Sequence, residues 1–181
     1  RDAGMVLNDK ILVGKMANPV REREAFIMKA VINNHPDFET AKLNHIITGS
    51  GLTDGFKASF EGGDLQIIRD NVFLIGTGIR TSTHGIDYLI EYFKKQKGKV
   101  YHIIVQELPP SPESFIHLDM VFTCLSMYEC MVYDQVIYRL SPYHTIYLKI
   151  ENGKVTIKEQ SNIPDALRKL GIDLKPVSCG G

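Results

Sequence analysis

The chain lacks several features that would assign it to a particular class of protein. It has no tryptophan, and its charge is balanced, with 21 basic and 21 acidic side chains among 181 residues. Proteins that bind nucleic acid or a membrane surface usually have a basic excess, so we expect neither kind of partner. No apolar run approaches the roughly 20 residues of a membrane-spanning helix, and no secretory signal is visible.

Cysteines are few and irregularly placed. The three of them cannot all pair, and their spacing matches neither a disulfide framework nor a zinc site; they are Cys124, Cys130 and Cys179. We therefore expect a cytoplasmic protein without a structural metal. Cys124 and Cys130 flank an apolar segment, which is typical of cysteines that serve as small core residues.

What the chain does contain is a repeat. An acidic residue precedes an apolar pattern three times, at Asp2, Glu61 and Asp119, and these positions recur about every 59 residues. Arg21 and Arg80 have the same separation. With 44% hydrophobic residues, the chain can form the core of one domain. We expect a single α/β domain over residues 1–181, built of strand–strand–helix–strand units at 1–50, 51–108 and 109–181.

The first two units have the clearer secondary-structure patterns. Apolar runs around polar turns predict a hairpin in each unit, and amphipathic spacing predicts a helix after each hairpin. The predicted strands lie near residues 4–7, 11–16, 46–47, 60–68, 72–76 and 100–108. The predicted helices cover residues 21–33 and 83–97, the second capped by Thr83 and followed by Gly98.

The third unit is longer than the others. Apolar patterns predict strands at 116–123, 131–137 and 174–177, with a helix over 163–170. The dipeptide Asn152-Gly153 lies between two alternating segments, which is a strong signal for a hairpin over residues 143–158. We interpret this hairpin as an insertion into the third unit.

Three polar residues lie where packing alone would not favour them. Glu61 is predicted at a strand edge beside Gly62 and Gly63, which have no side chain to shield it. His117 and Asp119 are predicted on one face of a strand, two residues apart. A carboxylate among apolar residues is costly without a partner. These residues therefore indicate a functional site.

Other polar residues keep a structural alternative at this point. Asp2 could cap a turn, Arg21 could be an ordinary residue in the first turn of a helix, and Arg80 could pair with a surface acid.

Several segments, taken together and in their order, resemble the arginine deiminase family. They are Arg1-Asp2, Arg21–Glu24, Glu61–Asp64, Ile75–Thr81 and His117–Thr123. That family belongs to the guanidine-modifying, or amidinotransferase, superfamily, whose fold is a five-bladed α/β propeller of such units. The resemblance runs over nearly all of the chain. It implies a partial α/β propeller of about three of the five units, and hence a fragment of a longer protein.

The resemblance also implies a role for each site residue. Asp2 and Asp119 would bind the guanidinium of the substrate, because forked N–H donors match carboxylates. His117 would be the general acid and base, oriented by Glu61. Arg21 and Arg80 would hold the α-carboxylate of arginine. The reaction would run through a cysteine thiolate and a thiouronium intermediate to citrulline and ammonia, with no metal or organic cofactor.

This sequence departs from the family pattern in two places. The family's nucleophilic cysteine lies further along the chain, and Cys179 follows His117 too soon to be its counterpart, so we expect the nucleophile to be missing. Ile79 stands where the family has a glutamate before the arginine, which leaves the exact guanidine substrate open. The alternatives are an amidinotransferase, a deiminase for another guanidine, or a non-catalytic fragment that binds arginine or mediates assembly. Because an open propeller exposes unpaired faces, a homo-oligomer is possible.

Overall fold

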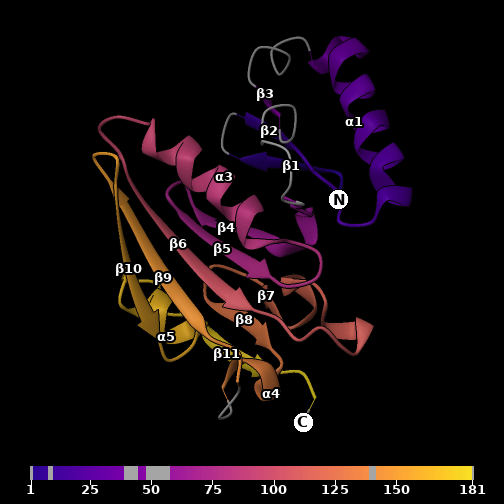
Figure 1. The fold of residues 1–181 in the computed structure, drawn as a ribbon. Helices are drawn as coiled ribbons and strands as arrows, with labels where there is room; N and C mark the ends of the chain where they lie inside the picture. Colours follow the sequence, from indigo (N-terminus) through magenta and orange to yellow (C-terminus); the bar gives the residue numbers. More distant parts are fainter. Residues whose placement is uncertain (1, 8–9, 39–44, 48–57, 139–141, 181) are drawn as a thin grey trace.

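The computed structural model describes residues 2–7, 10–38, 45–47, 58–138 and 142–180, with 45–47 described as backbone only. These residues form a mixed α/β structure with three sheets (Figure 1). Within the described part of the chain the sheets stay separate and do not close into a ring. No helix in these described ranges is long and apolar enough to cross a membrane.

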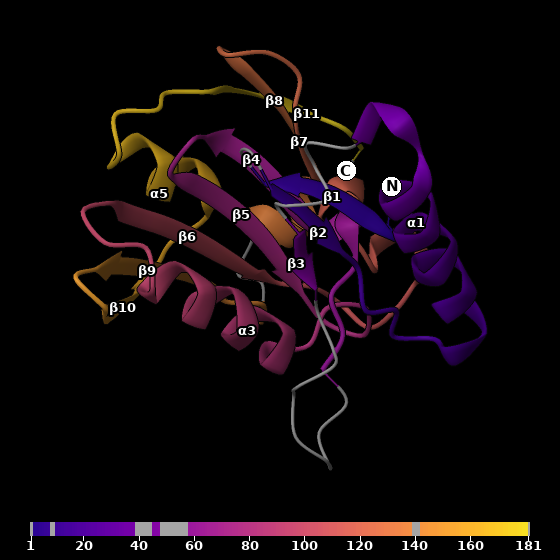
Figure 2. The ribbon, with the colours of Figure 1, turned by 90° about the horizontal axis from the view of Figure 1, so that it is seen from above.

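The first sheet contains three strands in the order β1 (Gly4–Leu7), β2 (Lys10–Val13) and β3 (His45–Ile47). β1 and β2 pair antiparallel, as the hairpin pattern predicted, and β3 lies parallel to β2. After a 3-10 turn at Pro19–Arg21, helix α1 (Glu22–Asn34) flanks this sheet (Figure 2). Ile32 is its only buried residue.

The central sheet is the largest, with strand order β10-β9-β6-β5-β4. Its strands are β4 (Leu65–Arg69), β5 (Val72–Thr77), β6 (Val100–Glu107), β9 (Thr145–Glu151) and β10 (Lys154–Gln160). Helix α3 (Thr83–Lys94) covers one face, where Phe73 and Tyr101 pack on Phe93. Ser82, rather than the expected Thr83, caps this helix by accepting a hydrogen bond from Gly85 N.

The hairpin of β9 and β10 pairs with the central sheet. Asn152 and Gly153 both have positive φ, at 51° and 75°, which confirms the predicted turn. β9 pairs antiparallel with β6 over seven residues. Along the chain the hairpin lies between β8 and β11 of the third sheet, as expected for an insertion into the third unit, and it pairs with the second edge of the apolar strand β6.

The third sheet has the order β11-β8-β7 and covers the other face of the central sheet. Its elements are β7 (Phe122–Cys124), β8 (Glu129–Val132), α4 (Asp134–Ile137), α5 (Ile163–Arg168) and β11 (Lys175–Ser178). Asn162 caps α5, and Gly171, with a φ of 71°, follows it. Leu74 and Ile104 of the central sheet share a core with Leu167 of α5.

Two strands predicted in this unit are shorter than expected. Residues 116–123 contain a 3-10 helix, Leu118–Met120, before β7 begins, and 131–137 divides into the end of β8 and helix α4. The apolar residues of this run are buried, since Leu118, Val121 and Phe122 are all almost fully inaccessible. When a segment is buried on all sides, its apolar and polar residues do not alternate, and the sequence pattern cannot distinguish a strand from a tight helical turn.

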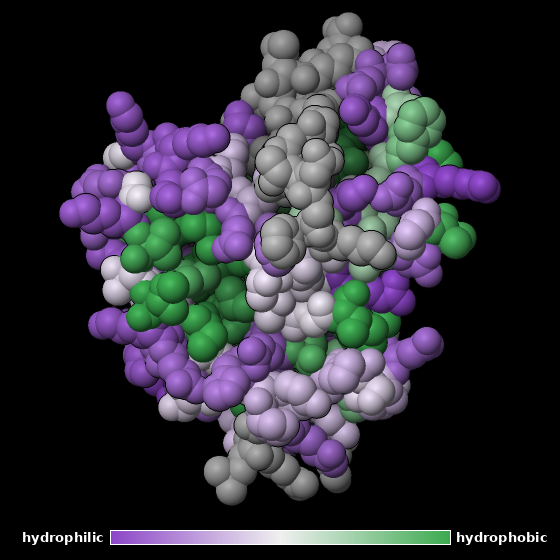
Figure 3. Space-filling model, in the orientation of Figure 1, coloured by the Kyte–Doolittle hydropathy of each residue, from purple (hydrophilic) through white to green (hydrophobic). Residues whose placement is uncertain are grey.

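Apolar side chains also lie on the surface. Figure 3 shows them over α1, where Phe26, Ile27 and Val31 are exposed, as is Val20 in the 3-10 turn before it. The helix therefore has an exposed apolar stripe, formed by Phe26, Ile27 and Val31.

Candidate functional site

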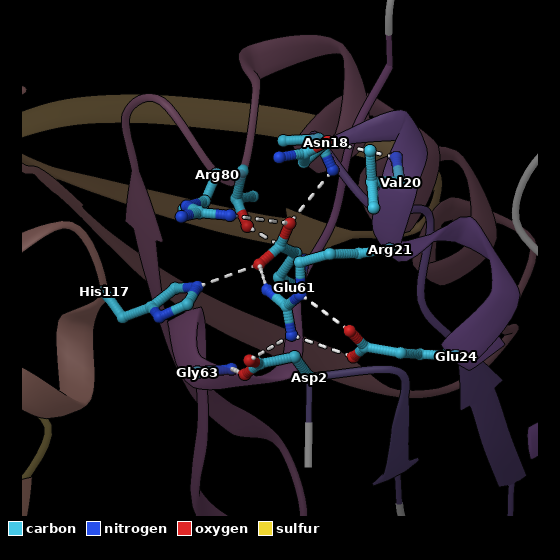
Figure 4. Close-up of polar contacts among 11 residues, drawn as sticks. Asp2, Asn18, Val20, Arg21, Glu24, Glu61, Gly63, Arg80 and His117 are labelled. Atoms are coloured by element: carbon cyan, nitrogen blue, oxygen red, sulfur yellow. Dashed lines mark hydrogen bonds and ion pairs between the residues drawn. The ribbon is translucent and has the colours of Figure 1, made fainter.

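Glu61 lies at the centre of a polar cluster (Figure 4). It directly precedes the 3-10 turn Gly62–Asp64, and its side chain is fully buried. The expectation of an unshielded carboxylate on a strand edge is therefore wrong. Other parts of the chain cover Glu61. Ala17 N donates a hydrogen bond to its Oε1 at 2.9 Å, and Glu61 N donates one to Thr81 Oγ1 at 3.1 Å.

The imidazole of His117 pairs with Glu61. Nε2 of His117 lies 3.1 Å from Oε2 of Glu61, and 8% of His117 is exposed. The Gly-Gly pair makes this approach possible, because a Cβ on Gly63 would lie 2.8 Å from His117 Cγ. Burial lowers the pKa of His117, but the hydrogen bond to Glu61 and the surrounding carboxylates outweigh it and raise that pKa above its usual value.

Asp2 joins the first unit to this pair. Its Oδ1 accepts a hydrogen bond from Gly63 N at 3.0 Å, and its backbone oxygen accepts one from Gly62 N at 3.0 Å. Single side-chain atoms of Asp2, Glu61 and His117 lie within 4.8 Å of one another. Burial opposes ionisation of Asp2, yet Arg21 and His117 hold its pKa below the usual range. The structure thus brings together three residues from three predicted units.

Both predicted arginines also face the cluster. Nη1 of Arg21 lies 3.0 Å from Glu61 Oε2, and its Nη2 lies 2.9 Å from Asp2 Oδ2. Arg80 is more distant, with Nη1 at 3.9 Å from Glu61 Oε1. Hydrogen bonding to Glu24 is the largest influence on Arg21 and raises its pKa, against the effect of burial. Glu61 is correspondingly favoured in its ionised form, since His117, Ala17 and the arginines overcome its burial and lower its pKa.

Asp119 does not share a strand face with His117. It lies within the 3-10 helix Leu118–Met120, it is half-buried, and its backbone oxygen accepts a hydrogen bond from Thr123. Among the residues that the structure describes, it is not a member of the 4.8 Å group. A 3-10 turn rotates successive side chains by about 120°, so residues two apart diverge.

Sequence reasoning gave no role to Asp64, Thr81 or Glu24. Asp64 is fully buried, and its Oδ1 accepts a hydrogen bond from Leu118 N at 3.0 Å, which ties the His117 segment to the second unit. Burial raises the pKa of Asp64 to about 7, against the lowering effect of the Thr81 hydroxyl. The sequence signal was present, because Asp64 completes the Glu-Gly-Gly-Asp motif.

The same cluster is the group of residues that could hold a metal ion. Asp2, Glu61 and His117 offer two carboxylates and an imidazole. In this arrangement the guanidinium of Arg21 already supplies a cation to both carboxylates. The cluster is therefore formed around a planar cation with several N–H donors.

Two of the three cysteines lie in the third sheet, and Cys179 comes directly after its strand β11. Cys130 is fully buried in the core and Cys124 lies opposite it on β7, as expected for small core residues. Burial raises the pKa of Cys130 to about 11. Cys179 follows β11, and its N–H donates to Val132 O at 2.9 Å. Figure 1 shows β1, which follows Asp2, well apart from β11, which precedes Cys179.

Comparisons with known proteins find relatives of this chain. A chain from Bacillus cereus described as arginine deiminase is 30% identical over 187 residues, which cover all of this chain and 44% of that protein. Among solved structures, the amidinotransferase SxtG from Microseira wollei matches with a TM-score of 0.57 and 17% identity, over 99% of this chain and 63% of that chain. The dimethylarginine dimethylaminohydrolase of Pseudomonas aeruginosa, complexed with citrulline, matches with a TM-score of 0.54 and 14% identity, over 98% and 67%.

The chain spans less than half the length of the curated relatives that it matches. The two structural neighbours show that this chain shares its fold with these enzymes. The model of the family described as arginine deiminase matches residues 1–181, the whole of the chain. This protein therefore belongs to the arginine deiminase family.

Proposed function

We propose that this chain forms the part of a guanidine hydrolase that binds substrate and carries the general acid and base, and that the whole enzyme converts L-arginine to citrulline and ammonia. One observation carries the proposal: Oε2 of Glu61 is shared between the imidazole of His117 and a guanidinium, that of Arg21. A guanidinium, the functional group of the proposed substrate, thus already lies beside His117, the candidate proton donor, as part of Arg21. Family membership over the whole chain supports the same reaction.

In this proposal the carboxylates bind and His117 moves protons. Asp2 and Asp119 bind the substrate guanidinium, while Glu61 orients His117 and stabilises its charged form. The raised pKa of His117 supports this role, because a protonated imidazole can give a proton to the ammonia that leaves. After that step the neutral imidazole accepts a proton from the attacking water. Arg21 and Arg80 bind the α-carboxylate and so select an amino acid.

A cysteine thiolate completes the proposed reaction. It attacks the guanidinium carbon, the C–N bond to one amino group breaks, and ammonia leaves with the proton from His117. Water then displaces the thiolate from the thiouronium intermediate and leaves citrulline. We assign the nucleophile to a segment outside this chain, since Cys124 and Cys130 are core residues.

We also propose that the three sheets are consecutive blades of an α/β propeller with about five units. The site residues support it, because Asp2, Glu61 and His117 each precede the first strand of a different sheet. Those strands are β1, β4 and β7. Superfamily neighbours that match nearly the whole chain support the same arrangement.

A second candidate is binding without catalysis. The exposed apolar stripe of α1 favours a role in assembly, because stripes of this kind mark protein interfaces. An amidinotransferase remains a related alternative, since a structural neighbour has that description. Both alternatives keep the guanidinium-binding cluster and differ in the step after binding.

Calorimetric titration of the chain with L-arginine tests the proposed site, with agmatine as the analogue that lacks the carboxylate. We expect L-arginine to bind and agmatine to bind more weakly, because agmatine leaves the arginines unpaired. Asp2→Asn should weaken both ligands by roughly tenfold or more, whereas Glu22→Gln, on the exposed first turn of α1, should not. If neither ligand binds the folded chain, the proposed function is wrong.

A citrulline assay on the same chain addresses the nucleophile. We expect no turnover of L-arginine. Turnover that disappears in Cys179→Ala would place the nucleophile inside this chain and overturn its assignment to another segment.

A further inference from the structure

Arg21 makes contacts that differ from its expected role. It was expected to be open to the carboxylate of a ligand. Instead, its guanidinium lies against three carboxylates of its own chain (Figure 4). Nη1 donates to Glu61 and Nη2 to Asp2, while Nε and Nη2 both donate to Glu24 at 2.9 Å. In the proposed function, two of these carboxylates have other partners, since Asp2 binds the substrate's guanidinium and Glu61 orients His117.

We propose that Arg21 is an internal stand-in for the substrate's guanidinium: it closes the empty acidic cluster, and a guanidine ligand binds by displacing it. The proposal rests on the proposed function and adds a competition within the same site. Displaced from Asp2 and Glu61, Arg21 turns to the α-carboxylate of the incoming ligand. Arg21 therefore has two positions, one on Asp2 and Glu61 in the empty site and one on the α-carboxylate of the bound ligand.

Charge balance is the first argument. Glu61 is fully buried and Asp2 about three-quarters inaccessible, so two carboxylates this close need a cation in the empty state. Arg21 supplies it, and its own side chain is 26% exposed, which leaves it a route outward. Replacing one guanidinium by another keeps the charge and the forked hydrogen bonding of the cluster.

The second argument is the position of Glu24, which holds Arg21 in place. It lies three residues along α1, and its two oxygens bind Nε and Nη2 of Arg21 side-on. Its side chain is 47% exposed, outside the buried part of the cluster. Glu24 therefore holds the solvent side of the Arg21 guanidinium and makes its departure less favourable.

The competition has a consequence for selectivity. A guanidine without a carboxylate has to displace Arg21 and offers it no new partner. L-arginine displaces the same side chain and offers an anion in return. Selection for an amino acid therefore comes partly from the penalty of removing Arg21, in addition to the direct contact with the α-carboxylate.

The experiment compares L-arginine with methylguanidine, a guanidinium that lacks a carboxylate, by calorimetry on four forms of this chain. These are the wild type, Arg21→Ala, Glu24→Gln and the matched control Glu22→Gln. We expect Arg21→Ala to bind methylguanidine roughly tenfold more tightly and L-arginine more weakly than the wild type does. Glu24→Gln should bind both ligands more tightly, and Glu22→Gln should match the wild type.

The outcomes separate the competing explanations. If Arg21 only binds the carboxylate, Arg21→Ala weakens L-arginine and leaves methylguanidine unchanged, and the proposal is overturned. Should Arg21→Ala fail to fold by circular dichroism, Glu24→Gln decides, and unchanged affinities there overturn the proposal as well. Absence of binding in all four folded forms would instead contradict the proposed function on which the inference rests.

Discussion

His117 and Glu61, 56 positions apart in the sequence, form a nearly solvent-free pair with 3.1 Å between Nε2 and Oε2. The pair links the predicted third unit to the second. A second carboxylate, that of Asp64, holds the backbone next to His117 through Leu118 N. The position of the imidazole is therefore determined by two acidic residues of one four-residue motif.

The pair predicts that His117 titrates above the usual histidine range and that Glu61→Gln lowers its pKa. The protonated imidazole loses its charged partner in that variant, so the charged form is less favoured. NMR titration of the His117 ring protons measures both values. Glu91→Gln, an exposed change on α3, serves as the control and should leave the titration unchanged. A His117 pKa that is the same with and without the Glu61 carboxylate would contradict the pairing.

Asp64 predicts a pH dependence of stability. Its pKa is raised to about 7 in the folded chain, so the neutral form is favoured by folding. The stability that this contributes is complete below the unfolded value of about 3.9 and is lost as the pH rises toward 7. Asp64→Asn, which keeps an acceptor for Leu118 N, should therefore match the wild type near pH 4 and be more stable at pH 8.

Thermal unfolding at several pH values measures the effect of Asp64→Asn. Asp87→Asn on the exposed side of α3 is the control and should follow the wild type throughout. If Asp64→Asn changes stability equally at both pH values, folding does not raise the pKa of Asp64 and the prediction is wrong.

Gly63→Ala should disrupt the site directly. The new Cβ would lie 2.8 Å from His117 Cγ, closer than packed atoms allow, and at a tight 3.1 Å from Asp2 Oδ1. We expect a loss of about 1–3 kcal/mol in the free energy of unfolding, measured by urea denaturation, together with a lower pKa of His117. Gly78→Ala is the matched control, because its Cβ would meet Leu108 at an ordinary 3.5 Å. Equal stability of the two variants would show that His117 can move aside without cost.

The apolar stripe on α1 predicts self-association of this chain. Phe26 is 73% exposed and is flanked by Ile27 at 60%, so a second copy or another protein surface can cover them. Light scattering at increasing concentration should show association in the wild type and less of it in Phe26→Glu. Ile157→Glu places the same charge on β10, at a residue 65% exposed, and should leave association unchanged. A wild type that stays monomeric at high concentration would contradict the prediction.

The local pattern of residue types was sufficient to predict many of the strands and helices. The hairpin of β9 and β10 follows from Asn152-Gly153 between alternating strands, and the helix α1 follows from its amphipathic spacing. The family could also be recognised from the sequence, because the motifs around Glu61 and His117 occur in the order that the family has. The family model matches the whole chain. Each of these depends on neighbours along the chain, where residue types restrict the backbone directly.

Only the tertiary structure decided the partners of these elements and of the charged residues. β9 could pair with any open edge, and it lies on β6. Arg21 could face a ligand, solvent or an acid, and it lies on Glu61 and Asp2. Pairing across a sheet and between charges depends on which groups folding brings within a few ångströms, and on the cost of burying a charge without a partner. That cost acts in three dimensions, so no spacing along the chain could reveal where Arg21 would find its carboxylates.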